Sequence, residues 1–271
     1  MLSILNSISS LTAENALSST QANLQKTLTE LSTGLKINSG SDDAAGLSIA
    51  NGLQANISAL TQSSQNSSDG VGLLQTADGA LSQVTTLLNR AVTLATEAST
   101  GGLSTSQSSA LDTEYQSILT EIGNIGTTTN YNGEAIFGTT SAVFTSDGTS
   151  SGSNTTSTTI GALTTAALSL TSTALTSTTA AQTALTDISA AISTVAANRG
   201  SIGAAVNQLN AGMNVENTEV TNLTSAENNV QNADIGQTVA QMTQFNVLQQ
   251  TGMAALSQSN QAQQSVLKLL Q

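Results

Sequence analysis

The side chains that could do acid–base or metal chemistry are few in this chain. Its 271 residues include no His and no Cys, and five basic residues stand against 17 acidic ones. The usual general base, the thiol nucleophile and the common zinc ligands are therefore missing. The adjacent acids Asp42 and Asp43 would point about 100° apart on a helix, so they do not form a paired-carboxylate site. We expect no enzyme, no cofactor and no metal site.

A helix start accounts better for these acids. Ser41 offers an N-cap hydroxyl, and Asp42 and Asp43 place negative charge on the first turn, where backbone N–H groups point outward. Asp112 and Glu114 are predicted to lie on a solvated helix face.

Two apolar stripes at helical spacing mark the ends of the chain. The first repeats at intervals of 7, 4, 3 and 4 residues and consists of Leu17, Leu24, Leu28, Leu31 and Leu35. The second alternates steps of 4 and 3 and consists of Leu248, Gly252, Ala255, Ser259, Ala262, Val266 and Leu269. We call them the front and back seams. Each could be covered by the other terminal segment or by another subunit, and composition alone leaves both open.

The composition favours long helices with narrow contacts. Aromatic residues make up 2% of the chain, charged residues 8%, and Pro is absent. Without Pro, the commonest helix breaker is missing, and an Ala- and Leu-rich sequence fills thin seams better than a thick core. Uncharged polar surfaces approach one another without large desolvation terms, so we expect close packing with copies of the same chain.

The charge and hydropathy argue against nucleic acid and membranes as partners. The net charge is −12, and the five basic residues are scattered. A phosphate backbone finds no basic patch on such a surface. No apolar run approaches 18 residues, and the first residues have neither a basic region nor a cleavage site, so we expect no membrane span and no Sec export.

The periodic segments predict a mainly α fold, an elongated hairpin of long helices forming an antiparallel coiled-coil bundle with a small β-hairpin or loop tip. The expected helices cover residues 1–36, 41–98, 104–122, 180–232 and 235–271. Ser104 and Gln107 form a capping box, and Asn132-Gly133 predicts a tight turn before a short strand. The Ser/Thr-rich tract between the Asn132-Gly133 turn and the fourth helix is expected to face the surface as a polar tip.

Several motifs resemble bacterial flagellins. They occur in the family's order and are LSTGLKINSGSDDAAGLSIA (residues 31–50), TTNYNGEAIF, NRGSIGAAVNQLN, NLTSAENNVQNADIG and QQTGMAALSQSNQAQQSVLKLLQ. The resemblance covers roughly residues 1–140 and 180–271. It implies a structural subunit that polymerises into the flagellar filament for motility, located outside the cell and exported through the flagellar type III apparatus.

The resemblance also implies a domain arrangement. Residues 1–40 and 233–271 would form a terminal coiled coil lining the filament interior. Residues 41–140 and 180–232 would form an inner helical domain, and residues 141–179 would be a Ser/Thr-rich β-hairpin or loop in place of an outer domain.

The implied partners are further copies of the chain, the hook-associated junction and cap proteins, and a flagellar secretion chaperone that binds the segment 249–271. Arg90, Leu94 and Glu114 match positions through which flagellins engage vertebrate Toll-like receptor 5, with Leu94 as an apolar anchor. By default, Arg90 pairs with a nearby acid, Leu94 packs inward and Glu114 is solvated.

Two other functions compete with the filament subunit. The hook–filament junction protein resembles flagellin at both ends, although its acidic pair is typically followed by Pro, whereas Ala44-Ala45-Gly46 follows here. A secreted helical effector or adhesin would explain the heptads but not the order of the motifs.

Overall fold

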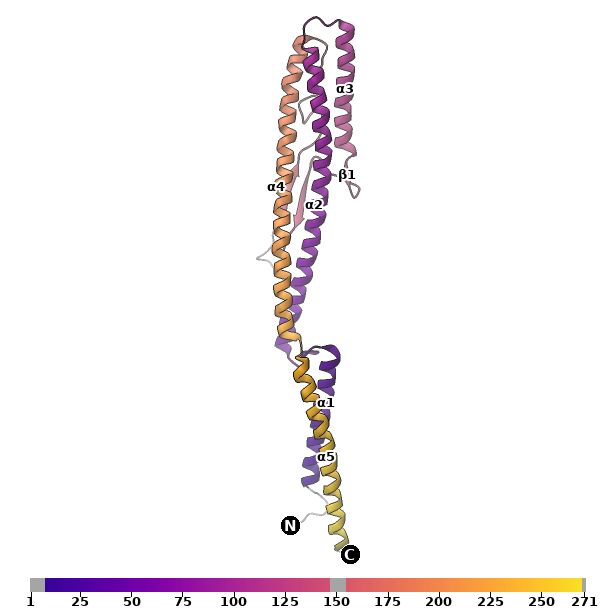
Figure 1. Cartoon of the computed structure of the whole chain (residues 1–271), viewed down its shortest axis with the longest axis vertical. Coiled ribbons are helices and arrows are strands. Elements are labelled where there is room, and N and C mark those ends of the chain that lie inside the picture. Colours follow the sequence, from indigo (N-terminus) through magenta and orange to yellow (C-terminus); the bar gives the residue numbers. More distant parts are fainter. Residues whose placement is uncertain (1–7, 147–154, 270–271) are drawn as a thin grey trace. The chain divides into compact units, whose positions relative to one another are not determined.

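The computed structural model describes residues 8–146 and 155–269, apart from a few side chains near the two ends. Its helices are α1 (Ile8–Thr33), α2 (Ala44–Ala98), α3 (Thr105–Thr128), α4 (Thr178–Gln231) and α5 (Ile235–Leu269). Its strands are β1 (Asn130–Tyr131), β2 (Glu134–Ala135), β3 (Thr139–Phe144) and β4 (Thr155–Ile160) (Figure 1). The predicted mainly α fold of long helices with a small β-hairpin is confirmed.

Local signals behave as predicted at two helix and strand boundaries. Ser104 and Gln107 form a reciprocal capping box at the start of α3. Asn132 and Gly133 have φ angles of 54° and 85°, and they join β1 to β2 as an antiparallel pair. Both turn residues lie in the left-handed region, which suits Asn-Gly in a type I′ hairpin.

The chain divides into two compact units. One consists of the described residues up to Ala55 and from Asn222 onward, and the other of Asn56–Thr221. We refer to them as the terminal unit and the central unit. Helices α2 and α4 contribute to both, because each runs past the boundary without a break.

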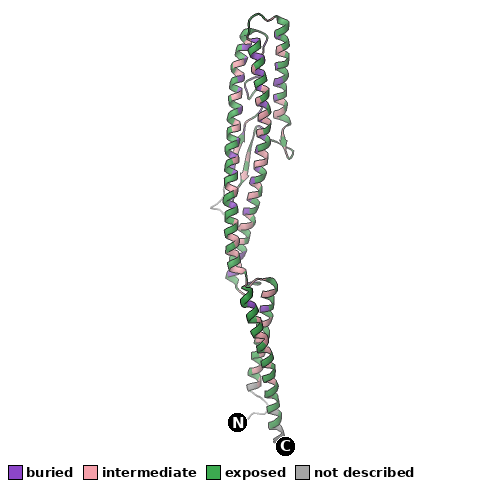
Figure 2. Ribbon diagram, viewed as in Figure 1, coloured by how far each residue is buried: buried purple, intermediate pink, exposed green. Residues whose placement is uncertain are grey.

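A strict heptad core holds the central unit together. The buried positions of α2 step by 3 and 4 residues and are Leu74, Ala77, Leu81, Val84, Leu88, Ala91, Ala95 and Ala98. Those of α4 follow the same rhythm and include Ala181, Ala184, Ile188, Ala191, Val195, Ile202, Ala205 and Leu209. The helices are antiparallel, since Asp78 binds Arg199 whereas the earlier Ser63 binds the later Glu216. Figure 2 shows the buried positions recurring along both helices.

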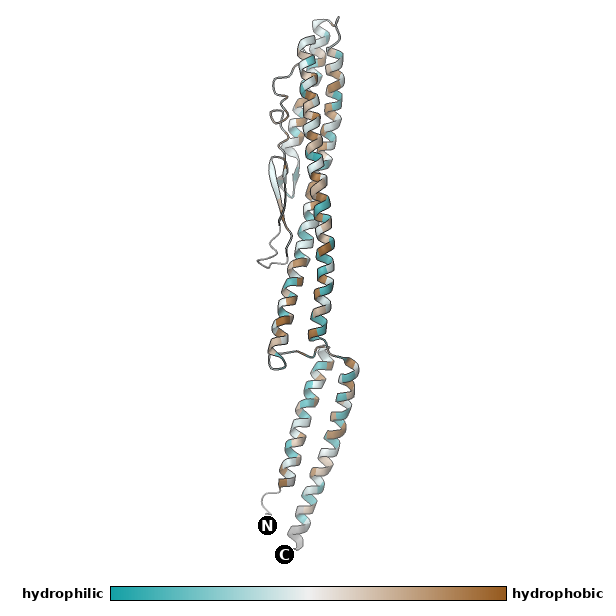
Figure 3. Ribbon diagram, turned by 90° about the vertical axis from the view of Figure 1, so that its left-hand side faces the viewer, coloured by the Kyte–Doolittle hydropathy of each residue, from teal (hydrophilic) through white to brown (hydrophobic). Residues whose placement is uncertain are grey.

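The prediction of a surface-facing polar tip is wrong for much of the tract. Strand β3 pairs with β4 from Thr139↔Ile160 to Phe144↔Thr155, and the segment that follows runs alongside the helices (Figure 3). Four leucines of this segment are at most 3% exposed: Leu163, Leu168, Leu170 and Leu175. Sparse leucines among many threonines are enough to anchor a segment to a helical surface that is already formed.

Polar contacts fix the same segment to α3. The hydroxyls of Tyr115 and Thr173 lie 2.6 Å apart, and Asp112 accepts the N–H of Leu175 at 2.7 Å. Burial raises the pKa of Tyr115, and the hydrogen bond to Thr173 opposes that rise. The prediction that Asp112 lies on a solvated face is therefore wrong, because its carboxylate satisfies a backbone donor of the tract.

Glycines within the long helices allow these segments to approach. A Cβ on Gly70 of α2 would lie 2.5 Å from Cγ2 of Val143 in β3. A Cβ on Gly126 of α3 would collide with the backbone carbonyl of Leu163. Neither glycine breaks its helix, so the cost of Gly in a helix interior is offset by close packing of the tract.

We predict that Gly126→Ala destabilises the central unit by about 1–3 kcal/mol, because the added methyl group displaces the Leu163 backbone. Gly123→Ala in the same helix is the matched control. Nothing lies within 4 Å of a Cβ at that position. The control should gain up to about 1 kcal/mol from helix propensity alone. Urea unfolding followed by tyrosine fluorescence measures both, and equal effects would contradict the packing described here.

Candidate functional site

The terminal helices α1 and α5 pair as an antiparallel coiled coil. The Oγ atoms of Ser10 and Ser259 lie 2.9 Å apart. Leu17 lies seven residues after Ser10 in α1, and it packs on Gly252, which lies seven residues before Ser259 in α5. The Cδ1 atom of Leu17 would lie 3.3 Å from a Cβ atom on Gly252. Contacts that repeat every seven residues in opposite directions are the signature of a heptad seam.

This seam is thin and partly polar. Its positions on α1 are Ser10, Ala13, Leu17, Thr20, Leu24, Thr27 and Leu31, and those on α5 are Thr238, Met242, Phe245, Gln249, Gly252, Leu256 and Ser259. Most remain half-exposed, and only Thr27 and Thr238 are buried, at 3% and 5%. Their hydroxyls donate to the carbonyls of Asn23 in α1 and of Asp234 just before α5, so burying them leaves no donor unsatisfied.

The structure divides the front seam. Leu17, Leu24 and Leu31 face α5, and Leu35 is half-buried at the end of α1. Leu28 lies off the seam, with 48% of its surface exposed.

The back seam is divided as well. Gly252 and Ser259 face α1, together with Gln249 and Leu256. Leu248, Ala255 and Ala262 are exposed instead. The side chains of Val266 and Leu269 lie outside the described residues. The face toward α1 contains Gln249, which an apolarity count passes over.

Large apolar side chains remain uncovered on both terminal helices. On α1 they are Ile8, Leu11 and Leu28, and on α5 they are Ile235, Val239, Val247, Leu248 and Met253. Their exposed fractions range from 41% to 80%. Figure 2 shows α1 and α5 mostly exposed, with few buried positions.

The connection between α1 and α2 is tied to the α4–α5 junction. The carbonyl oxygen of Gly34 accepts the N–H of Ala233, and the N–H of Lys36 donates to the carbonyl of Gln231. Gly34 has a φ of 74°. Leu35 and Asn232 form an antiparallel bridge. The two chain segments that leave the terminal coiled coil are therefore held together where they leave it.

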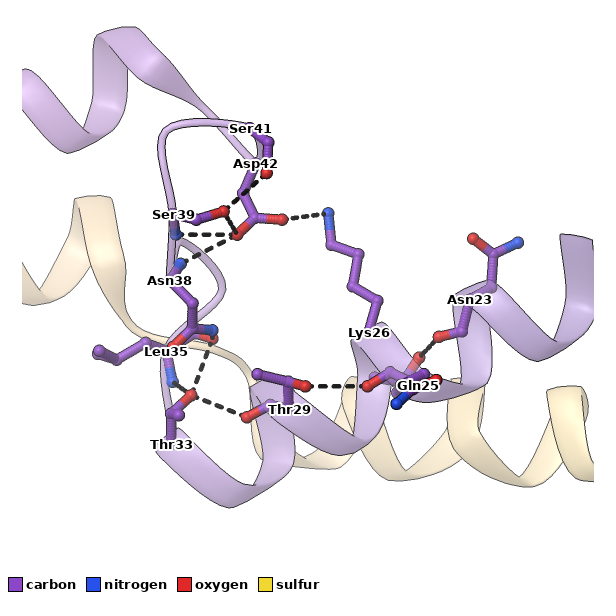
Figure 4. Close-up of polar contacts among 11 residues, drawn as sticks. Asn23, Gln25, Lys26, Thr29, Thr33, Leu35, Asn38, Ser39, Ser41 and Asp42 are labelled. Atoms are coloured by element: carbon purple, nitrogen blue, oxygen red, sulfur yellow. Dashed lines mark hydrogen bonds and ion pairs between the residues drawn. The ribbon is translucent and has the colours of Figure 1, made fainter.

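Asp42 organises the loop that follows. Its carboxylate accepts the N–H groups of Asn38 and Ser39, and its Oδ1 lies 3.1 Å from Lys26 Nζ on α1 (Figure 4). The hydrogen bond from Lys26 is the main cause that lowers the pKa of Asp42, and the bonds from Asn38 and Ser39 add to it. Asp42 thus closes the loop rather than occupying the first turn of α2.

The structure also corrects the predicted N-cap of α2. Helix α2 begins at Ala44, and Oδ1 of Asp43 accepts the N–H groups of Ala45 and Gly46 at 3.0 and 2.9 Å. Asp43 is therefore the N-cap, and Ser41, two residues earlier, bonds only to the Ser39 hydroxyl among the contacts described. Gly46 leaves room for Ile37, which is 3% exposed and packs above it.

The structure pairs Arg90 with a nearby acid and packs Leu94 inward, as expected without any receptor. Arg90 Nε donates to Glu114 Oε1 at 2.8 Å, and about half of each side chain is exposed. Leu94 is 1% exposed and belongs to the core of the central unit. The expectation that Leu94 forms an apolar anchor on the surface does not fit this burial.

The described residues offer little else that could act chemically. They bring together no group of three or more acidic side chains able to share a metal ion. Within the same residues, no helix combines the length and apolar character that crossing a bilayer requires.

Comparison with known proteins identifies the family. Residues 4–142 match the family model described as the bacterial flagellin N-terminal helical region, and residues 183–270 match the bacterial flagellin C-terminal helical region. The chain therefore belongs to the bacterial flagellin family, whose members are structural proteins.

Individual relatives agree with this assignment. Phase 1 flagellin of Salmonella naestved and the flagellins of Salmonella budapest and Salmonella derby are each 47% identical to the chain over 85 residues. That stretch is 31% of this chain and 17% of each relative. The crystal structure of Bacillus cereus flagellin is similar with a TM-score of 0.50 and 30% identity, covering 60% of this chain and 94% of that one.

We predict that Asp43→Ala loosens the start of α2, because two backbone donors lose their acceptor. The expected cost is about 1 kcal/mol, which corresponds to roughly fivefold faster amide exchange over residues 45–50. Ser41→Ala is the control and should leave these rates unchanged. The opposite ranking would restore Ser41 as the cap.

Proposed function

We propose that this chain is the repeating structural subunit of a bacterial flagellar filament. The observation that carries the proposal is the match of both helical family regions, in order, on a chain whose terminal helices carry uncovered apolar side chains. Copies docking through these helices would bury what the single chain leaves exposed.

The contacts suit an open-ended polymer. Leu28 and Leu248 lie outside the α1–α5 seam, so burying them requires a surface from another molecule. A head-to-tail arrangement uses different patches on the two partners and does not close on itself. We therefore propose that Leu28, Leu248, Ala255 and Ala262 are assembly contacts, while Leu17, Leu24, Leu31 and Leu35 serve the fold of the terminal unit.

The domain roles are also proposals. Residues 1–40 and 233–271 line the filament interior, and residues 41–140 and 180–232 form the surrounding shell. The tract 141–179 takes the place of an outer domain. The assembled protein is extracellular and reaches the filament tip through the flagellar type III apparatus, which a chain without Cys and Pro suits.

Further partners follow from the same proposal. A flagellar secretion chaperone binds the segment 249–271 before export, covering Met253 and the back seam. The hook-associated junction and cap proteins lie at the two ends of the filament.

A vertebrate receptor is a further proposed partner. The exposed Arg90–Glu114 pair supplies charged contacts to Toll-like receptor 5. Leu94 is buried in the core of the central unit and does not itself contact the receptor.

We predict that Leu28→Gln raises the critical concentration for filament growth on seeds by at least about fivefold. Covering the exposed half of a Leu side chain is worth about 1 kcal/mol. Thr29→Gln is the matched control, because Thr29 is exposed beside Leu28 but polar. Turbidity and electron microscopy of seeded samples measure growth.

Three outcomes would count against the proposal. Filaments that grow equally well from Leu28→Gln would remove Leu28 from the contact. Wild-type chain that forms only short, capped particles would favour the hook–filament junction protein. A chain that never polymerises on seeds would favour a secreted effector or adhesin.

A further inference from the structure

Three polar residues occupy heptad core positions between α2 and α4. The α2 core continues toward its start, at steps of 3 and 4, through Gly70, Ser67, Ser63 and Leu60. The α4 core reaches Glu216 in the same rhythm, seven residues after Leu209. Ser63, Ser67 and Glu216 therefore lie in a seam whose other buried positions are apolar or small.

These side chains are buried and incompletely bonded. Ser63, Ser67 and Glu216 are 1%, 0% and 6% exposed. Ser63 Oγ donates to Glu216 Oε1 at 2.7 Å and lies 3.4 Å from the carbonyl oxygen of Phe144. Within the described part of the chain, Ser67 Oγ and Glu216 Oε2 have no hydrogen-bond partner. Buried polar atoms without partners are rare in folded proteins, so these two oxygen atoms point to a ligand from outside the chain.

Among the side chains that the structure describes, no basic group pairs with Glu216. The central unit contains two basic residues, and both are occupied, since Arg90 pairs with Glu114 and Arg199 with Asp78. Lys26 and Lys36 belong to the terminal unit, where they contact Asp42 and the Asn229 carbonyl. A buried carboxylate without a compensating charge destabilises the fold, so binding of an external cation would stabilise it.

We propose that Glu216 holds a small monovalent metal cation of the sodium class inside the central unit. The oxygen ligands are the Glu216 carboxylate and the hydroxyls of Ser63 and Ser67, which lie one helical turn apart on the same face of α2. The Phe144 carbonyl oxygen lies 3.4 Å from Ser63 Oγ. All are oxygen atoms, which hard cations prefer.

The charge of the site selects for a monovalent ion. One carboxylate and three neutral oxygens balance a single positive charge, whereas calcium sites use several carboxylates. Binding would join α2, α4 and the end of β3 at one point. Polar residues at heptad positions also fix helix register, and that role alone predicts no dependence on any ion.

The experiment compares unfolding of the full chain in sodium chloride, potassium chloride and choline chloride at equal ionic strength. Both tyrosines of the chain, Tyr115 and Tyr131, lie in the central unit, so tyrosine fluorescence reports its unfolding. We expect the unfolding equilibrium constant to fall about tenfold when sodium is present at about ten times its dissociation constant. Choline is too large to enter and serves as the ionic-strength reference.

Two variants test the assignment to Glu216. Glu216→Gln keeps the shape but removes the charge, so its stability should be equal in all three salts. Glu219→Gln, one turn away and exposed, should retain the sodium effect of the wild type. If Glu216→Gln folds poorly, Ser67→Ala provides the second test. It removes one oxygen ligand and should weaken the sodium effect.

The proposal is overturned if the wild-type chain unfolds identically in the three salts, or if the sodium effect persists in Glu216→Gln.

Discussion

The structure depends on one constraint, the seven-residue repeat of small and aliphatic side chains between antiparallel helices. In the central unit this repeat places Leu, Ile, Val and Ala at buried positions from Leu74 to Ala98 in α2 and from Ala181 to Leu209 in α4. Such a seam needs no aromatic core, which accounts for a chain with 2% aromatic residues. It also needs helices without interruption, and the absence of Pro supplies them. Because the seam is narrow, α3 and the Ser/Thr-rich tract are needed to cover the rest of its surface.

The same repeat has a different outcome in the terminal unit. There the seam alternates Leu with Ser, Thr, Gly and Gln, so α1 and α5 bury little when they pair. Large apolar side chains are left on their outer faces. A helix pair with few buried contacts opens easily, and it gains most from a neighbour that covers it. Marginal pairing and exposed apolar faces together fit a subunit that becomes fully stable only within an assembly.

Much of this fold could be predicted from periodicity and turn chemistry. The helices, the capping box at Ser104 and the Asn132-Gly133 turn follow from local rules that tertiary packing does not override. The errors arise where tertiary contacts decide. Asp43 rather than Ser41 caps α2 because Asp42 is drawn to Lys26 and the loop amides. Leu163 and Leu175 are buried because helices elsewhere in the chain provide a surface for them. The sequence did not show which residues of α5 face α1, because Gly252 and Ser259 fit two overlapping repeats and the one that faces α1 includes a glutamine.

The central claim is that the apolar faces of α1 and α5 are covered by other copies of the chain. Amide hydrogen exchange, measured on the monomer and on seeded filaments of the same protein, tests it most directly. The account predicts fast exchange over residues 8–33 and 235–269 in the monomer and strong protection of both in filaments, with the α2–α4 core protected in each. Terminal helices that are already fully protected in the monomer, or that stay unprotected in filaments, would contradict it.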